Sequence, residues 1–267
     1  DYLFDSTLNG LFDSSDAATD LILTETIKLR YAKGQGALPI ADKIDRDYFD
    51  NYRGVGRYSE VWSQFTDPDY LMTLIKLVWN RAKNYKLLIA GSASGELVGA
   101  LRERGIDAWG IENNRAAHAK TPKALKKYNV LGSITDLPFK DGQFDFVFET
   151  SLCHVSDKQA DKAIGELRRV IKTGLIFGSV TSDLPAALID KFNLLRGVKK
   201  LGTWWEWSEL FFGNGFDLSM HRRDITDALW EATLAADKGP GQWYADADSL
   251  RYSFFDKTAG TAAPGVG

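Results

Sequence analysis

Short apolar runs separated by helical patterns recur through the middle of the chain. Residues 87–90 form an apolar run between polar residues, which is typical of a strand that is buried on both faces. Similar runs follow at residues 108–111, 129–132, 144–148 and 175–180. Because helical patterns lie between these runs, the sequence predicts a mostly parallel sheet with helices on both faces.

Apolar residues at helical spacing predict the helices that connect these strands. Asp67-Pro68 is a helix start, with Asp as the cap and Pro in the first turn, and the apolar positions predict a helix up to residue 84. A second helix is predicted from residue 96 to Gly105. A third is predicted over residues 157–172, with Gly174 as its terminator.

The last third of the chain adds an edge to the sheet. Residues 216–221 and 250–255 alternate between apolar and polar positions and predict an antiparallel strand pair. The predicted fold class is therefore α/β, with a Rossmann-like seven-stranded, mostly parallel sheet. Residues 1–66 are predicted to form a helical N-terminal cap or lid. The main domain is predicted over residues 67–257, with insertions at about 183–212 and 224–248, followed by a flexible tail at 258–267.

The segment from the first strand to the end of the second carries the most specific chemistry. Gly91 and Gly95 allow a tight turn and a close approach of the backbone to a ligand. The helix after this turn points its amide groups at that ligand. Glu112 ends the second strand, where a carboxylate can accept both hydroxyls of a ribose. The segment therefore predicts a nucleoside-binding site.

Composition narrows the class of protein and of partner. The chain has 267 residues, 44% apolar and 26% charged, which is typical of a globular protein. The formal net charge of −3 argues against nucleic acid as the main partner. One cysteine, Cys153, and three histidines leave no cluster for a structural metal. No apolar run approaches the roughly 20 residues of a membrane helix, so we expect a cytoplasmic enzyme without a membrane partner.

Four landmarks in order resemble the class I S-adenosylmethionine-dependent methyltransferases. They are the turn LLIAGSASGE, the acid Glu112, the run GSITDLPF followed by FDFV, and the helix and turn ELRRVIKTG. The resemblance implies S-adenosylmethionine as the cofactor. It also implies a set of cofactor-binding residues: Gly91, Ser92, Ala93, Gly95, Glu112, Asn113, Ser133, Ile134 and Glu149.

Three residues depart from the family pattern. The usual acid of the first strand falls at Ile89, the middle glycine of the turn at Ala93, and the acid that receives the adenine amino group at Ser133. Ala93 adds only a methyl group, and the Ser133 hydroxyl can still accept a hydrogen bond. The change at Ile89 removes a group that helps to hold the methionine end of the cofactor in many members.

The residues after the fourth strand are those that face the reactive sulfonium in the family. A methyl transfer needs an acceptor aligned with the methyl group and a base where the acceptor is protonated. His154 and Glu149 are the candidate catalytic residues, because an imidazole titrates near neutral pH and Glu149 lies beside it in this segment. The alternatives are a packing role for His154 and binding of the cofactor's amino group by Glu149.

Aromatic and basic residues on either side of the main domain predict the acceptor site. Aromatic walls suit a ring or a cation, and arginines suit a carboxylate or phosphate. Core packing is the alternative for the tryptophans. The candidate substrate-binding residues are Tyr52, Arg53, Arg57, Tyr58, Trp204, Trp205 and Trp207.

These features together predict an S-adenosylmethionine-dependent methyltransferase that acts on a small molecule, such as an amino acid or a natural-product intermediate. Two alternatives stay open. An enzyme of the same fold would cyclise the cofactor or transfer its aminocarboxypropyl group and release methylthioadenosine. A non-catalytic binding module would retain the fold without turnover. A homodimer is one option for the oligomeric state, which the sequence leaves open.

Overall fold

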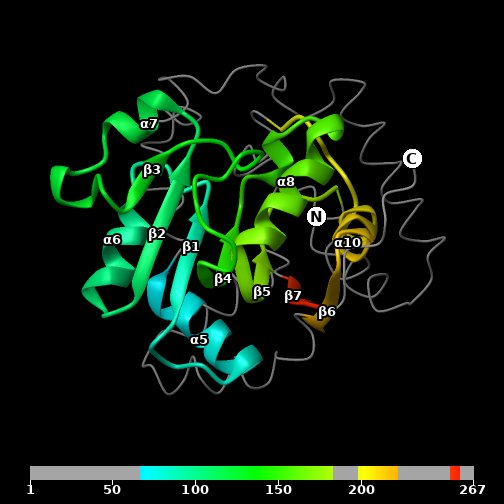
Figure 1. The fold of residues 1–267 in the computed structure, drawn as a ribbon, viewed down its shortest axis with the longest axis horizontal. Helices are drawn as coiled ribbons and strands as arrows, with labels where there is room; N and C mark the ends of the chain where they lie inside the picture. Colours follow the sequence, from blue (N-terminus) through cyan, green and yellow to red (C-terminus); the bar gives the residue numbers. More distant parts are fainter. Residues whose placement is uncertain (1–66, 183–197, 222–252, 259–267) are drawn as a thin grey trace, which may run out of the picture.

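The computed structural model describes residues 67–182, 198–221 and 253–258. In this part of the chain seven strands form one sheet with the order β3-β2-β1-β4-β5-β7-β6. The first five strands are parallel, and β7 pairs antiparallel with both β5 and β6 (Figure 1). The strands are β1 (Lys86–Ala90), β2 (Asp107–Glu112), β3 (Asn129–Leu131), β4 (Phe144–Glu149), β5 (Ile171–Phe177), β6 (Phe216–His221) and β7 (Ser253–Lys257).

Helices cover both faces of this sheet, as the sequence predicted. The α-helices are α5 (Pro68–Trp79), α6 (Glu96–Glu103), α7 (Arg115–Ala119), α8 (Asp157–Val170) and α10 (Trp204–Gly213), and short 3-10 turns are η2 (Lys123–Leu125) and η3 (Leu152–His154). Side chains of β1 alternate between the faces. Leu87 and Ile89 pack with α5 and α6 in one core cluster, whereas Leu88 and Ala90 pack with α8 and α10 in the other.

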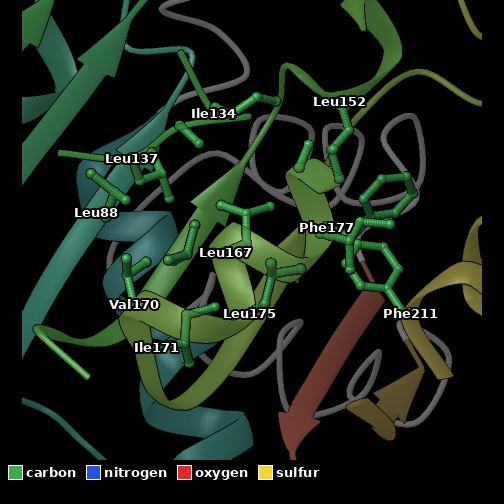
Figure 2. Close-up of a cluster of buried hydrophobic side chains, with 14 of the residues drawn as sticks. Leu88, Ile134, Leu137, Leu152, Leu167, Val170, Ile171, Leu175, Phe177 and Phe211 are labelled. Carbon is green, nitrogen blue, oxygen red and sulfur yellow. The ribbon is translucent and has the colours of Figure 1, made fainter. Parts of the chain in front are cut away.

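The core on the α8 side is the larger of these two clusters. Figure 2 shows Leu167 and Val170 of α8 over Leu175 and Phe177 of β5, with Phe211 of α10 beside them. Leu167, Val170 and Leu175 are fully buried. The α8 face therefore fixes β4 and β5, whose carboxyl ends carry part of the candidate site.

The structure corrects the predicted ends of two helices. α5 ends at Trp79, where Asn80 adopts a left-handed conformation with φ +52°, and not at residue 84. α8 ends at Val170 because Ile171 already belongs to β5. Gly174 therefore lies inside β5 and does not terminate the helix, and β5 ends at Phe177 and not at residue 180.

The place of Gly174 has a packing reason. A Cβ atom at this position would lie 2.6 Å from Cζ2 of Trp79. The indole of Trp79 thus occupies the space that a side chain at Gly174 would fill, and its Nε1 donates a hydrogen bond to Asp256 Oδ1 at 2.6 Å. The absence of a side chain at Gly174 therefore allows Trp79 of α5 to pack against β5 and to reach Asp256 of β7.

Several predicted segments lie outside the described residues. They are the N-terminal cap at 1–66, the insertion at 224–248, the first half of the insertion at 183–212 and nearly all of the tail at 258–267. α10 begins in the described half of the insertion at 183–212. The domain boundaries stay predictions. None of the helices in the described ranges is long and apolar enough to cross a membrane.

Candidate cofactor site

The turn between β1 and α6 has the conformation that its glycines were expected to provide. Gly91 and Gly95 have φ values of +86° and +84°, in the left-handed region that favours glycine. A Cβ atom on Gly91 would lie 2.8 Å from Cβ of Ser151, in the segment that follows β4. The turn therefore packs against the end of β4 at the carboxyl edge of the sheet.

Glu112 reaches from the end of β2 to this turn. Its Oε2 accepts a hydrogen bond from the backbone amide of Ala93 at 2.8 Å, and its Oε1 accepts one from the amide of Asn114 at 2.6 Å. The side chain is buried, and burial raises the pKa of Glu112 although these backbone hydrogen bonds lower it. A carboxylate with two oxygens fixed in this way stands at the tip of β2, where ribose binding was predicted.

A buried amide that the sequence analysis missed supports the same turn. Asn129, at the start of β3, accepts a hydrogen bond from Ser92 Oγ at 2.5 Å and donates one to the carbonyl of Ala93 at 3.1 Å. The side chain of Asn129 is fully buried. The sequence does show an asparagine in a predicted strand, which could have indicated a buried polar contact. That its partner is Ser92 depends on the register of β3 against β2, which the sequence does not give.

Glu149 occupies the end of β4 and is fully buried. Its Oε1 accepts hydrogen bonds from the backbone amides of Ser151 and Leu152. Its Oε2 accepts one from Ser179 Oγ at 3.0 Å. Burial raises the pKa of Glu149 to about 7, against the lowering effect of these hydrogen bonds. The raised pKa brings the titration of the Glu149 carboxyl close to neutral pH.

His154 lies at the end of η3 and is partly exposed. Its backbone amide donates to the carbonyl of Ser151 at 2.9 Å, which closes the turn after β4. Burial dominates the pKa shifts of Glu112 and Glu149, and a positive charge on His154 acts in the opposite direction on both. The structure therefore couples the imidazole electrostatically to both carboxylates.

The segments after β2 and β3 hold the remaining predicted cofactor residues. Ser133 Oγ lies 2.8 Å from Thr135 Oγ1 and accepts a hydrogen bond from the amide of Thr135 at 3.2 Å. Ile134 is buried in the same cluster as Leu88. Asn113 is exposed directly after Glu112. All of these residues follow the carboxyl ends of β2 and β3.

The predicted substrate residues separate into three groups. Trp204 and Trp205 of α10 stack, with ring centroids 5.1 Å apart, and Trp205 is 57% exposed. Trp207 is fully buried and packs against Phe177, so it contributes to the core in this structure. The third group, Tyr52, Arg53, Arg57 and Tyr58, lies outside the described residues. Among the described residues no group of three or more His, Cys, Asp or Glu side chains could hold a metal ion.

Comparison with known proteins agrees with this geometry. Residues 88–177, which run from β1 to the end of β5, match the family model of a methyltransferase domain. This segment is similar to methyltransferase domains of the class I fold. The sequence resemblance implied S-adenosylmethionine as the cofactor, and one solved structure of this fold, magnesium protoporphyrin IX methyltransferase, holds bound S-adenosylhomocysteine. No curated protein matches the chain.

Solved structures are similar to this chain at low sequence identity. Magnesium protoporphyrin IX methyltransferase from Synechocystis PCC 6803, with bound S-adenosylhomocysteine, has a TM-score of 0.53 and 14% identity, covering 80% of this chain and 98% of that chain. A chain of the complex between the Haloferax volcanii Trm112 methyltransferase activator and a methyltransferase has a TM-score of 0.50 and 13% identity, covering 76% and 99%. The [4+2]-cyclase SpnF has a TM-score of 0.48 and 18% identity, covering 89% and 93%.

The residues of this segment fit the ribose end of a nucleoside cofactor more closely than its methionine end. Glu112 and the turn are in place, and Ser151 Oγ, beside Gly91, is a buried hydroxyl without a hydrogen-bond partner among the described residues. At the family's first-strand acid, Ile89 is buried in the core. On the neighbouring strand, the carboxylate of Glu149 follows Phe148, the residue that pairs with Ile89.

Proposed function

We propose that the protein binds S-adenosylmethionine at the carboxyl ends of β1 and β2 and methylates a small molecule. The observation that carries this proposal is the link between Glu112 and the turn. Its two carboxylate oxygens hold the amides of Ala93 and Asn114, so the acid has one orientation at the tip of β2. An acid oriented at this place suits the two ribose hydroxyls of a nucleoside.

We assign the remaining cofactor contacts by position. Gly91, Ser92, Ala93 and Gly95 let the backbone approach the ligand, and Asn113, Ser133 and Ile134 border the adenine. Glu149 is proposed to receive the cofactor's ammonium group, because its Oε2 accepts one hydrogen bond from Ser179 and a carboxylate oxygen has room for a second donor. This contact would replace the one that Ile89 does not provide.

His154 is the proposed base. His154 follows Ser151 and Leu152, whose backbone amides donate to Glu149, so its backbone lies at the carboxyl end of β4, where we propose that the acceptor approaches. The bound cofactor supplies an activated methyl group on sulfur. The chain's part is to align the acceptor with that methyl group and to remove the acceptor's proton. A group that removes protons by this route contributes about 100-fold to 10,000-fold in rate.

The proposed acceptor is a small molecule with a ring or a cationic group. The stacked pair Trp204 and Trp205 offers an aromatic surface. Tyr52, Arg53, Arg57 and Tyr58 are proposed to complete this site. The structural neighbour from Synechocystis acts on magnesium protoporphyrin IX, and the net charge of −3 does not favour nucleic acid. We also propose that the enzyme is cytoplasmic, with a homodimer as an option.

One observation favours a second candidate reaction. Residue 89 is a buried isoleucine, so no acid at this position holds the methionine end of the cofactor. A methionine end repositioned for lack of this acid would present another carbon for attack, which leads to aminocarboxypropyl transfer or to cyclisation of the cofactor. The two reactions leave different products. Methyl transfer leaves S-adenosylhomocysteine, whereas the alternatives release methylthioadenosine.

Product analysis tests the proposal. The protein is incubated with S-adenosylmethionine and a panel of amino acids, aromatic amines and phenols, and nucleoside products are identified by mass spectrometry. We expect S-adenosylhomocysteine and one acceptor heavier by a methyl group, both lost in His154→Ala. Methylthioadenosine as the sole nucleoside product would replace methyl transfer with the second reaction. Binding without turnover of any kind would indicate a non-catalytic module.

A further inference from the structure

Ala93 adopts a backbone conformation that its side chain disfavours. Its φ is +48°, in the left-handed region, and it stands at the position where the methyltransferase turn usually has a glycine. Such a conformation persists only where the surroundings determine it. The peptide groups on both sides of Ala93 are indeed held, because its N–H donates to Glu112 Oε2 at 2.8 Å and its carbonyl accepts from Asn129 Nδ2 at 3.1 Å.

The orientation of the Asn129 amide is itself fixed. Its Oδ1 accepts from Ser92 Oγ at 2.5 Å, and its Nδ2 donates to Thr121 Oγ1 at 2.8 Å as well as to the carbonyl of Ala93. Both hydrogens of the amide nitrogen are thereby used. Because Asn129 is fully buried, water does not replace any of these partners without opening the core.

The strand opposite Asn129 is shaped to admit this amide. Gly110 of β2 pairs with Asn129 of β3 in the sheet. A Cβ atom on Gly110 would lie 2.3 Å from Asn129 Oδ1 and 2.5 Å from Ser92 Oγ. The absence of a side chain at Gly110 therefore leaves room for the hydrogen bond between Asn129 of β3 and Ser92 of the turn. This hydrogen bond connects the sheet to the turn.

We propose that Asn129 is a positioning residue of the cofactor site, which holds Ala93 in the left-handed conformation that a glycine would adopt without help. The inference rests on the proposed function in so far as the site binds S-adenosylmethionine. Without the donor from Asn129, Ala93 returns to negative φ and its N–H turns away from Glu112. The carboxylate of Glu112 then loses one of its two fixed contacts, so the acid and the turn change together.

A double-mutant cycle tests this coupling. Asn129→Asp keeps the size of the side chain and an acceptor for Ser92, but it replaces the donor to the Ala93 carbonyl by an oxygen. We expect it to weaken S-adenosylmethionine binding about tenfold in calorimetry, and less than about threefold when Ala93→Gly is also present, because glycine needs no support at positive φ. Equal weakening in both backgrounds would overturn the proposal.

A matched control separates positioning from a general loss of stability. Thr121→Val removes the other acceptor of the same Asn129 nitrogen and leaves the Ala93 carbonyl untouched. We expect Thr121→Val to lower the melting temperature and to leave the cofactor dissociation constant within about twofold, since the contact with the turn is kept. Weakening as large as that of Asn129→Asp would mean that Asn129 acts through stability alone.

A second readout does not depend on the cofactor. Hydrogen exchange of the Ala93 amide is followed by NMR in the ligand-free protein. We expect Asn129→Asp to accelerate this exchange at least about tenfold, and Ala93→Gly to restore slow exchange at residue 93 in the double variant. Unchanged exchange would contradict the proposal. If the unaltered protein does not bind S-adenosylmethionine, the proposed function fails while this measurement still decides the role of Asn129.

Discussion

The backbone amide of Ala93 and the carboxylate of Glu112 are joined by a hydrogen bond of 2.8 Å between the turn after β1 and the end of β2. These two elements are adjacent because β1 and β2 are parallel neighbours, with Ala90 paired to Ile111. The carboxyl ends of both strands meet at the same edge of the sheet, where ligands of open α/β sheets bind. The pair thus connects the fold to the proposed cofactor site.

The titration of Glu149 predicts a pH-dependent stability. Its pKa is about 7 in the folded protein and about 4.5, the ordinary value for glutamate, in the unfolded chain, so between these values the folded state holds a proton that the unfolded chain releases. Raising the pH through this window therefore lowers the free energy of unfolding, by up to about 1.4 kcal/mol per pH unit for one group. Glu149→Gln should flatten the melting temperature between about pH 5 and 7.

Asp145→Asn is the matched control for this experiment. Asp145 lies at the opposite end of the same strand, where its carboxylate accepts from the backbone amide of Lys86 at 2.7 Å. The fall of the melting temperature between about pH 5 and 7 should persist in this control. A Glu149→Gln variant with the same pH slope as the unaltered protein would contradict the raised pKa of Glu149.

The tryptophans of α10 should respond differently to the same substitution. Trp207 is fully buried against Phe177, and removal of a buried tryptophan side chain costs about 3–5 kcal/mol of stability. Trp205 is 57% exposed, so Trp205→Ala should change stability by no more than about 0.5 kcal/mol. Urea unfolding measures both changes in stability.

If Trp205 lines the acceptor site, Trp205→Ala raises KM for the acceptor, and an unchanged KM would remove Trp205 from that site.

The position of Gly174 inside β5 predicts a compensating pair. Gly174→Ala places a methyl group 2.6 Å from the indole of Trp79 and 2.9 Å from the carbonyl oxygen of Phe255. We expect a loss of about 1–3 kcal/mol in urea unfolding, as for other overpacked cores. Trp79→Leu should recover part of this loss in the double variant, because it vacates the space beside residue 174. Strict additivity of the two losses would argue against the contact.

His154 should affect the rate more than binding. His154→Gln keeps a polar side chain but removes the group that accepts a proton, so we expect kcat to fall at least about 100-fold with little change in the KM for S-adenosylmethionine. The rise of kcat with pH that reports the base should disappear as well. His118→Gln is the control substitution, since His118 lies in α7 and its Nε2 is 2.7 Å from the carbonyl oxygen of Asn129. Equal effects of both substitutions would contradict a catalytic role for His154.

Local patterns predicted most of the sheet but not the packing that fixes its details. The runs at 87–90, 108–111 and 144–148 lie within β1, β2 and β4, because strands buried on both faces are mostly apolar. The end of α8 was predicted incorrectly because Gly174 resembles a helix terminator in sequence. Its reason, the indole of Trp79, comes from a distant helix, which a local pattern does not contain.

The site shows the same division. Gly91, Gly95 and Glu112 could be predicted because a strand, a turn and a second strand bring them together within one short segment. Asn129 could not, since its contact with Ser92 requires the register of β3 against β2. The burial of Trp207 likewise depends on how α10 packs on β5.

Calorimetric titration of S-adenosylmethionine, beside the same titration on Glu112→Gln, tests the central claim most directly. Glutamine offers one carbonyl oxygen where Glu112 binds the amides of Ala93 and Asn114 with two, so the fixed acid at the tip of β2 is lost. Asp107→Asn, at the other end of β2 and 45% exposed, is the control. We predict micromolar binding that weakens at least about tenfold in Glu112→Gln and persists in Asp107→Asn. Absence of binding to the unaltered protein, or equal binding to Glu112→Gln, would contradict the proposed site.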